Sequence, residues 1–195
     1  SAQVGTAIGG LTREFELIAH NLANVSTPGF KRRYNDFSKS LTEQEGSLAS
    51  NSSKEPQAGI VIDFSQGSFT QTGRKLDLAL CGKGFFVIET PDGPLYTRNG
   101  TFRLNENSQI VDLAGRIVAG QSGPITIPQS VDVSLLSVGD DGNISANGVP
   151  LGQLKLVDFQ DQQTTLIPAG LNCFKAPENA EALAAENLIV KQGFQ

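Results

Sequence analysis

The first 25 residues carry apolar side chains at alternating spacings of four and three residues. The apolar positions are Val4, Ile8, Leu11, Phe15, Ile18, Leu22 and Val25. Because this spacing keeps the side chains on one stripe of an α-helix, it predicts an amphipathic helix of the coiled-coil type. An isolated helix of this length is marginal in water, so the stripe, which we call the seam, needs another surface to cover it. The sequence therefore predicts a helix with a partner.

The residues after the seam predict where this helix ends. Pro28 disfavours the helical conformation at Thr27, and Gly29 can adopt a left-handed backbone. We therefore expect the helix to end near Val25. Asn21 and Asn24 fall in its last turn, where their amides can reach the carbonyl groups that a helix end leaves unpaired.

From Gly59 onward the apolar pattern becomes strand-like. Short runs rich in Val, Ile and Phe, such as GIVIDF and ALCGKGFFVIE, are separated by turn residues. Turns are predicted at residues 91–93 (PDG), 99–100 (NG), 105–108 (NENS), 140–143 (DDGN) and 147–148 (NG). The pattern predicts consecutive hairpins in a mainly β fold, an irregular antiparallel sandwich-like or barrel-like domain behind the helix.

These patterns divide the chain into four predicted parts. Residues 1–30 form the helix and its stop, and residues 31–58 form a linker whose stretch 38–58 is almost free of large apolar groups. Residues 59–177 form the all-β domain. The Ala-rich residues 178–195 are expected to be a tail, either a short helix or an extended segment.

The string NLANVSTPGFKR at residues 21–32 resembles the amino-terminal signature of the bacterial flagellar rod and hook proteins. The matching residues are Asn21, Leu22, Ala23, Asn24, Thr27, Gly29 and Phe30. The segments 65–88, 90–112, 123–128 and 151–159 resemble the central segments of the same family in the same order. Because the matches are several and ordered, they are far more specific than one motif.

The resemblance implies a structural subunit of the flagellar rod, needed for motility and most similar to proximal rod members. The seam is then the assembly interface in an inner tube of helices, and the β domain forms an outer layer. Implied partners are other rod and hook proteins and further copies of the chain. The implied location is the basal body in the periplasmic space, reached by type III export without a cleaved Sec signal. The closing KQGF resembles the start of the family's second terminal helix, so we expect a carboxy-terminal truncation.

Charge and candidate chemistry give no competing function. The net charge of −5 provides no basic field for nucleic acid, and no apolar run is long enough for a membrane helix. His20, the single histidine, is expected to be solvated on the polar side of the helix, which leaves no plausible zinc set or Ser-His-Asp triad. Cys81 and Cys173 are expected to be small buried side chains without a disulfide. We predict no enzyme, no cofactor, no metal and no small-molecule substrate.

Three motifs have a structural interpretation in preference to a chemical one. Gly82-Lys83-Gly84 lacks the spacing of a phosphate loop and indicates a bulge or tight bend. The DDGN string lacks the downstream glutamate of a calcium loop and indicates a hairpin turn. The Asp77 and Glu89 carboxylates are not part of a visible acidic cluster.

Two questions stay open at the level of sequence. Arg74 and Arg98 lie in family-like blocks and either contact neighbouring subunits or pair with Asp77 or Asp92 inside the domain. The alternative function is a cell-surface β domain that binds a glycan or a protein, with the helix as a stalk.

Overall fold

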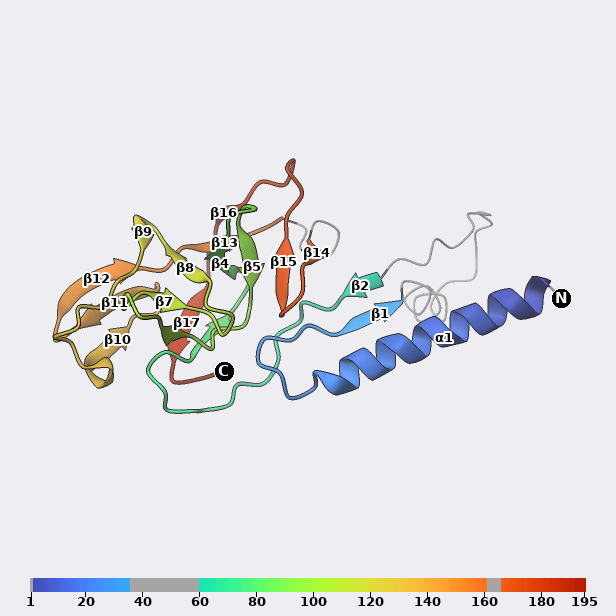
Figure 1. Ribbon diagram of the computed structural model, residues 1–195, viewed down its shortest axis with the longest axis horizontal. Coiled ribbons are helices and arrows are strands. Elements are labelled where there is room, and N and C mark those ends of the chain that lie inside the picture. Colours follow the sequence, from blue (N-terminus) through green and yellow to red (C-terminus); the bar gives the residue numbers. More distant parts are fainter. Residues whose placement is uncertain (1, 36–59, 161–165) are drawn as a thin grey trace. The chain divides into compact units, whose positions relative to one another are not determined.

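The computed structural model describes residues 2–35, 60–160 and 166–195 (Figure 1). Chain contacts divide the protein into two compact units. The first contains the residues up to Thr27 and Lys31–Ser65, and the second contains Pro28–Phe30 and Gln66–Gln195. The polar stretch 38–58 of the predicted linker lies outside the described residues.

The first unit consists of one helix and a two-stranded ribbon. Helix α1 spans Ala2–Ala23, and strands β1 (Arg33–Asn35) and β2 (Ile60–Ile62) pair antiparallel, with Arg33 opposite Ile62. The amides of Asn24 and Val25 bond the carbonyls three residues earlier, so the helix ends in a tighter turn slightly before the predicted stop. Both ribbon strands lie near the ends of the predicted linker, and β2 belongs to this unit although its residues begin the predicted β domain.

The second unit is built from short antiparallel strands. They are β3 (Leu78–Cys81), β4 (Phe85–Glu89), β5 (Leu95–Thr97), β6 (Arg103–Leu104), β7 (Ile110–Val111), β8 (Ile117–Gly120), β9 (Gly123–Pro124), β10 (Leu136–Val138), β11 (Asn143–Ala146), β12 (Val149–Gln153), β13 (Leu156–Asp158), β14 (Ile167–Pro168), β15 (Cys173–Lys175), β16 (Leu183–Ala184) and β17 (Ile189–Gln192). A single 3₁₀ turn, η1 (Val133–Leu135), precedes β10 in the described part.

The strands of this unit form three sheets. The largest follows the order β14-β15-β5-β4-β8-β7-β6, with β13 and β16 added beside β4 and β9 added beside β8. The others are β10-β11-β12 and β17-β3. The path of the large sheet is open, since it ends at β6 and β14 and does not close into a barrel. The prediction of a mainly β, antiparallel fold behind one amino-terminal helix is confirmed.

The core of the second unit is apolar and continuous across these sheets. It contains Leu78, Phe86, Ile88, Phe102, Ile110, Val118, Ile127, Leu136, Ile144 and Leu154, each almost fully buried. The Phe86 ring packs edge-on against Phe102, with centroids 5.0 Å apart. Burying side chains of this size contributes about 1.5 to 3 kcal/mol each, so this unit has a core of its own.

Three of the predicted turns join paired strands directly, whereas residues 99–100 lie between β5 and β6, which do not pair with each other. Residues 91–93 join β4 to β5, residues 105–108 join β6 to β7, and residues 147–148 join β11 to β12. Asn147 and Gly148 have φ angles of 50° and 79°, the left-handed values that a tight hairpin requires. The segment Gly82-Lys83-Gly84 is a bend between β3 and β4, as expected from its glycines.

The carboxy-terminal segment is extended, one of the two predicted conformations, and part of it pairs within the β unit. Residues 178–195 contain β16 and β17, and β17 pairs along β3 from Ile189 opposite Cys81 to Gln192 opposite Leu78. Val190 is almost fully buried in the core. The alanines gave a helical bias, but burial of Val190 and pairing with a strand more than a hundred residues away favour the extended conformation.

Candidate functional site

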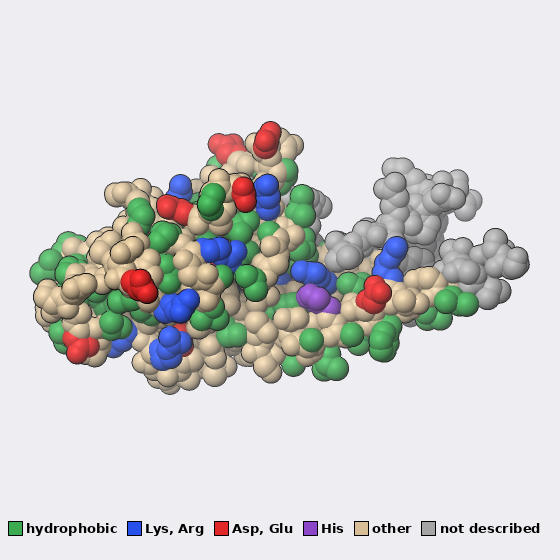
Figure 2. Space-filling view, in the orientation of Figure 1, with side chains coloured by type: hydrophobic (Ala, Val, Ile, Leu, Met, Phe, Trp, Pro, Cys, Tyr) green, Lys and Arg blue, Asp and Glu red, His purple; other side chains and the backbone are tan. Residues whose placement is uncertain are grey.

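The seam on α1 is exposed to solvent. Ile8, Leu11, Phe15, Ile18, Leu22 and Val25 are between 58% and 75% exposed. The side chain of Val4 lies outside the described part of the structure. Figure 2 shows apolar side chains gathered along one edge of the helix. The helix therefore presents a continuous apolar stripe that the described residues of its own unit leave open.

The helix already packs on its ribbon with a different face. Leu17 is only 9% exposed, and His20, Asn21 and Asn24 are half-buried. These four positions are spaced three and four residues apart, so they form a second stripe that contacts β1. At about 100° per residue this stripe lies largely opposite the seam. The ribbon and a partner on the seam can therefore bind the helix together.

His20 lies at the contact with the ribbon, and the prediction of a solvated histidine is wrong. The sequence pattern identified the seam but gave no sign that β1 would cover the opposite face. Burial lowers the pKa of the His20 imidazole below its usual 6.5, and the positive charge of Arg33 lowers it further. The neutral imidazole is therefore the form that the folded unit prefers.

Acidification is expected to loosen the packing of α1 on β1. Because the folded pKa of His20 is below 6.5, the unfolded state binds more protons between these two pKa values. Stability is thus fully present above pH 6.5 and declines as the pH falls from there toward the folded pKa. Hydrogen exchange at the Arg33 amide measures this opening, and His20→Gln should make the exchange insensitive to pH after correction for the intrinsic rate. Equal pH dependence in both proteins would contradict the assignment to His20.

Asn21 links the helix to the ribbon by two hydrogen bonds. Its side-chain amide donates to the Arg33 carbonyl at 2.7 Å, and its oxygen accepts from the Arg33 N–H at 2.9 Å. The side chain thus pairs with the peptide groups of β1 in the manner of a neighbouring strand. Asn24 has a different role, because its amide donates to the His20 carbonyl at 2.9 Å and covers the helix end. The helix-end role predicted for both asparagines fits Asn24, whereas the Asn21 side chain bonds the strand.

Within the second unit, the Gly29 backbone approaches the Arg98-Asn99 backbone more closely than any other residue type allows. Gly29 has a φ angle of 68°, and a Cβ atom at this position would lie 2.4 Å from the Asn99 nitrogen and 2.6 Å from the Arg98 carbonyl carbon. Both distances are far below any normal contact, and both neighbours are backbone atoms that cannot move aside. The residues Pro28–Phe30 therefore dock on the segment Arg98-Asn99.

Arg98 supports this docking segment from inside the β domain. The residue is 9% exposed, and its Nη1 donates to the carbonyls of Gly82 and Gly84, both at 2.7 Å. Its Nη2 donates to Gln66 Oε1 at 3.1 Å. Burial lowers the pKa of the guanidinium, while the nearby Asp158 carboxylate opposes that shift. These bonds favour the role within the domain over the subunit contact that the sequence also allowed.

Arg74 has partners within the domain and is still exposed, and its Nη2 donates to the Phe102 carbonyl at 3.4 Å. Its Nη1 lies 2.9 Å from the Asp77 carboxylate, whose side chain is 2% exposed, whereas the Arg74 side chain is 56% exposed. The pairing with Asp77 that the sequence considered is present. The exposed part of the Arg74 side chain leaves a subunit contact as an additional role.

The thiols and acidic groups form no reactive cluster in the described residues. Cys81 and Cys173 are free; Cys173 is buried as predicted, whereas Cys81 is only half-buried. Burial raises the pKa of the Cys173 thiol, although Arg116 opposes the shift. Residues 2–35, 60–160 and 166–195 bring together no group of three His, Cys, Asp or Glu side chains suited to a metal ion. No helix among them is long and apolar enough to cross a bilayer.

Comparison with known proteins identifies the family. Residues 79–146 match the family described as "Flagellar hook protein FlgE/F/G D1 domain". The flagellar basal-body rod protein FlgF of Caulobacter vibrioides is 32% identical over 189 residues, which cover 94% of this chain and 75% of that protein. FlgF of Salmonella typhimurium is 33% identical, covering 90% of this chain and 72% of that protein. FlgG of Bacillus subtilis is 34% identical, covering 89% of this chain and 72% of that protein.

The matches to these relatives cover 89% to 94% of this chain. FlgF and FlgG proteins match at similar identity, so the comparison supports the family without distinguishing between these two members. The relatives are named as basal-body rod proteins, and none of these names suggests a surface adhesin. The chain belongs to the family of flagellar basal-body rod proteins.

Proposed function

We propose that this chain is a structural subunit of the bacterial flagellar rod. The exposed seam carries the proposal, because the face of α1 opposite to it is already occupied by the ribbon. Burying seven apolar side chains of this size releases on the order of 10 to 20 kcal/mol of gross transfer free energy. That gain is available when helices of neighbouring axial subunits cover the seam.

The proposed assembly uses the two units differently. Residues 1–30 supply the helix for an inner tube, the linker 31–58 connects it, and the β domain forms an outer layer. Each subunit binds the next through unlike surfaces, and such contacts generate an open helical polymer when the rotation between subunits does not close. Rod and hook proteins and further copies of the chain are the proposed partners, with Arg74 as a candidate contact.

The proposed location is the basal body in the periplasmic space, reached by export without a cleaved Sec signal. A structural role without catalysis fits the names of the relatives, all of which are rod proteins. Among the two rod types we favour the proximal rod, on the resemblance of segments 123–128 and 151–159.

Complementation tests this function in the native bacterium. In a strain lacking the gene, the full-length protein with a small epitope tag is expected to restore swimming and to copurify with detergent-extracted basal bodies. A tagged protein that restores nothing, or that is absent from purified basal bodies of swimming cells, would refute the proposal. The wild-type gene without the epitope tag serves as the control for the effect of the tag.

A further inference from the structure

Glycine follows asparagine or aspartate at four places in the β domain. The pairs are Asp92-Gly93, Asn99-Gly100, Asp141-Gly142 and Asn147-Gly148. In such a pair the backbone nitrogen of glycine can attack the side-chain carbonyl carbon of the preceding residue and close a five-membered succinimide ring. Glycine has no side chain to hinder this attack. The reaction needs the nitrogen close to the carbonyl carbon, so the local structure decides which pair reacts.

Hydrogen bonds hold the two aspartate pairs. The glycine amides at positions 93 and 142 donate to the carbonyls three residues earlier, at 3.1 Å and 2.9 Å. The Asp141 carboxylate also accepts from the Asn143 backbone nitrogen at 3.0 Å and from its side-chain amide at 2.9 Å. Carboxylates that are ionised near neutral pH are in addition poorer electrophiles than amides. Neither aspartate pair is arranged for ring closure.

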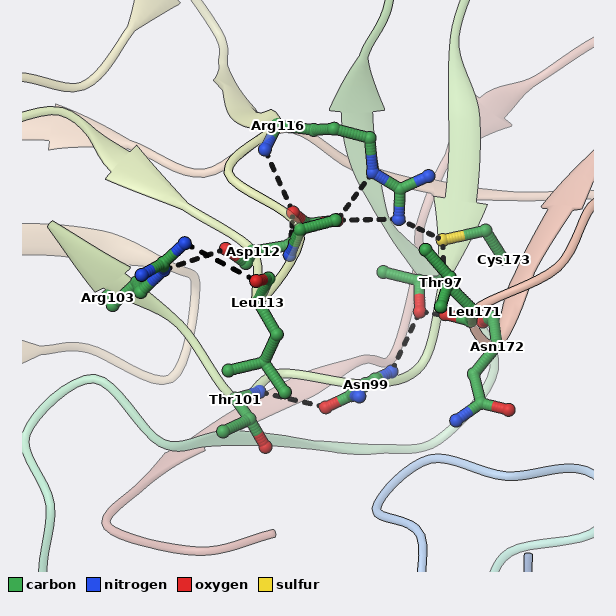
Figure 3. A network of polar contacts seen from close by, with 11 residues as sticks. Thr97, Asn99, Thr101, Arg103, Asp112, Leu113, Arg116, Leu171, Asn172 and Cys173 are labelled. Carbon is green, nitrogen blue, oxygen red and sulfur yellow. Dashed lines mark hydrogen bonds and ion pairs between the residues drawn. The ribbon is translucent and has the colours of Figure 1, made fainter. Parts of the chain in front are cut away.

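The Asn99-Gly100 pair is held by packing and by hydrogen bonds. Figure 3 shows Asn99 between two threonines, and its Oδ1 accepts from the Thr101 nitrogen while its own nitrogen donates to Thr97 Oγ1, both at 3.0 Å. Gly100 is buried, and its carbonyl accepts from the Leu78 nitrogen at 2.9 Å. A Cβ on Gly100 would overlap the Leu78 carbonyl. The Gly100 nitrogen therefore cannot turn toward the asparagine side chain without breaking these contacts.

The Asn147-Gly148 pair has no such restraint. It is the two-residue loop between β11 and β12, and both residues are exposed. Among the residues that the structure describes, no hydrogen bond holds the Asn147 side chain or the Gly148 amide. A Cβ on Gly148 would meet no atom within 4 Å. Ring closure here requires only a rotation of the loop peptide, which no neighbouring segment opposes.

We propose that Asn147 is a site of spontaneous deamidation. The Gly148 nitrogen loses its proton and forms a bond to Cγ of Asn147, and the side-chain nitrogen takes up a proton and leaves as ammonia. Water then opens the succinimide at either of its two carbonyl groups and yields aspartate or isoaspartate. The net reaction consumes one water and releases one ammonia, so it needs no oxidant, reductant or enzyme. The inference does not depend on the proposed rod function.

The two products differ in their effect on the β11–β12 hairpin. Both place a new negative charge at its exposed tip. Aspartate tolerates the left-handed φ angle of 50° at position 147 and should leave the hairpin folded. Isoaspartate routes the backbone through the side-chain methylene and lengthens the loop that joins the paired residues Ala146 and Val149. Isoaspartate should therefore speed hydrogen exchange in this hairpin, because the longer loop no longer fits the tight turn.

The two Asn-Gly pairs provide an internal comparison for the test. The purified protein is incubated at mildly alkaline pH, and peptide mass spectrometry measures the conversion of each asparagine over time. In the folded protein Asn147 is expected to react about tenfold or more faster than Asn99. In denaturant the two rates should become similar, because the contacts that restrain Asn99 are gone. Equal folded-state rates, faster conversion at Asn99, or an Asn147 that reacts only in denaturant would each overturn the inference.

A pair of glycine variants tests the route through the succinimide. Gly148→Ala places a methyl group beside the attacking nitrogen and should slow conversion at Asn147 about tenfold or more. The matched control is Gly170→Ala. Gly170 has a φ angle of 81°, close to the 79° of Gly148, and a Cβ there also meets no atom within 4 Å. The control carries the same backbone penalty and should leave the rate at Asn147 unchanged. Unchanged conversion in Gly148→Ala, or equal slowing in both variants, would contradict attack by the Gly148 nitrogen.

Discussion

Replacing Leu22 by aspartate is expected to abolish incorporation of the protein into the rod and with it swimming. Leu22 is 71% exposed in the isolated chain, so the change removes no contact that the described residues of the folded protein make. In the assembly, however, the seam is covered, and a carboxylate at its carboxy-terminal end would be taken out of water without a partner. The variant loses the roughly 1.5 to 3 kcal/mol that burial of leucine contributes to assembly. Desolvating the buried charge adds a much larger cost in free energy.

Two control variants separate the seam from the helix as a whole. Leu22→Ile keeps an apolar side chain of the same size and should assemble nearly as well as wild type. Glu16→Lys changes the charge by two units at an exposed position about 120° around the helix, so it should also assemble. Basal-body content and swimming measure assembly, and thermal unfolding of the β domain should be unchanged in all three variants. Normal motility with Leu22→Asp would refute the seam as the assembly surface.

The features that sequence predicted well are those set by local periodicity. The seam spacing placed six side chains on one exposed stripe, and the Asn-Gly pair at residues 147–148 placed a tight hairpin. Both follow from side chains a few residues apart, and no distant segment alters them. The mainly β fold follows for the same reason, since strands and turns alternate along the sequence.

Features that depend on contacts between distant segments could not be predicted from the sequence. The strand β17 forms because its residues pair with β3, although the alanine-rich sequence around it favours a helix. Asn21 was interpreted as a helix-end residue, because nothing in the sequence places the Arg33 peptide beside it. His20 was expected in solvent for the same reason. Each error concerns a face or a partner supplied by a segment that local patterns cannot locate.

Gly29 combines both kinds of information. Its place after Thr27-Pro28 predicted a left-handed backbone that stops the helix, and its φ angle of 68° agrees. The sequence did not reveal the close approach to Asn99, which makes glycine necessary for a second reason. Glycine is thus required at position 29 for two reasons, the left-handed backbone conformation and the lack of space for a side chain.

Gly29→Ala is expected to dislodge Pro28–Phe30 from the β domain. The added methyl group would lie 2.4 Å from the Asn99 nitrogen, which donates to Thr97 Oγ1 at 3.0 Å. The left-handed backbone costs about 1 to 2 kcal/mol with a Cβ, and overpacking against backbone atoms costs about 1 to 3 kcal/mol more. Hydrogen exchange should become faster at the Asn99 amide and across residues 28–30, and incorporation into basal bodies should fall.

Gly73→Ala separates the two contributions to this loss. Gly73 has a φ angle of 73°, close to that of Gly29, but a Cβ there meets no atom within 4 Å. The Gly73 variant should therefore show only the backbone penalty, with unchanged exchange at Asn99 and normal assembly. If both variants behave alike, left-handed strain explains the effect and the docking of Gly29 on Asn99 has no separate role. A larger effect of Gly29→Ala confined to residues 28–30 and Asn99 assigns it to the contact, because the two glycines differ chiefly in what a methyl group would touch.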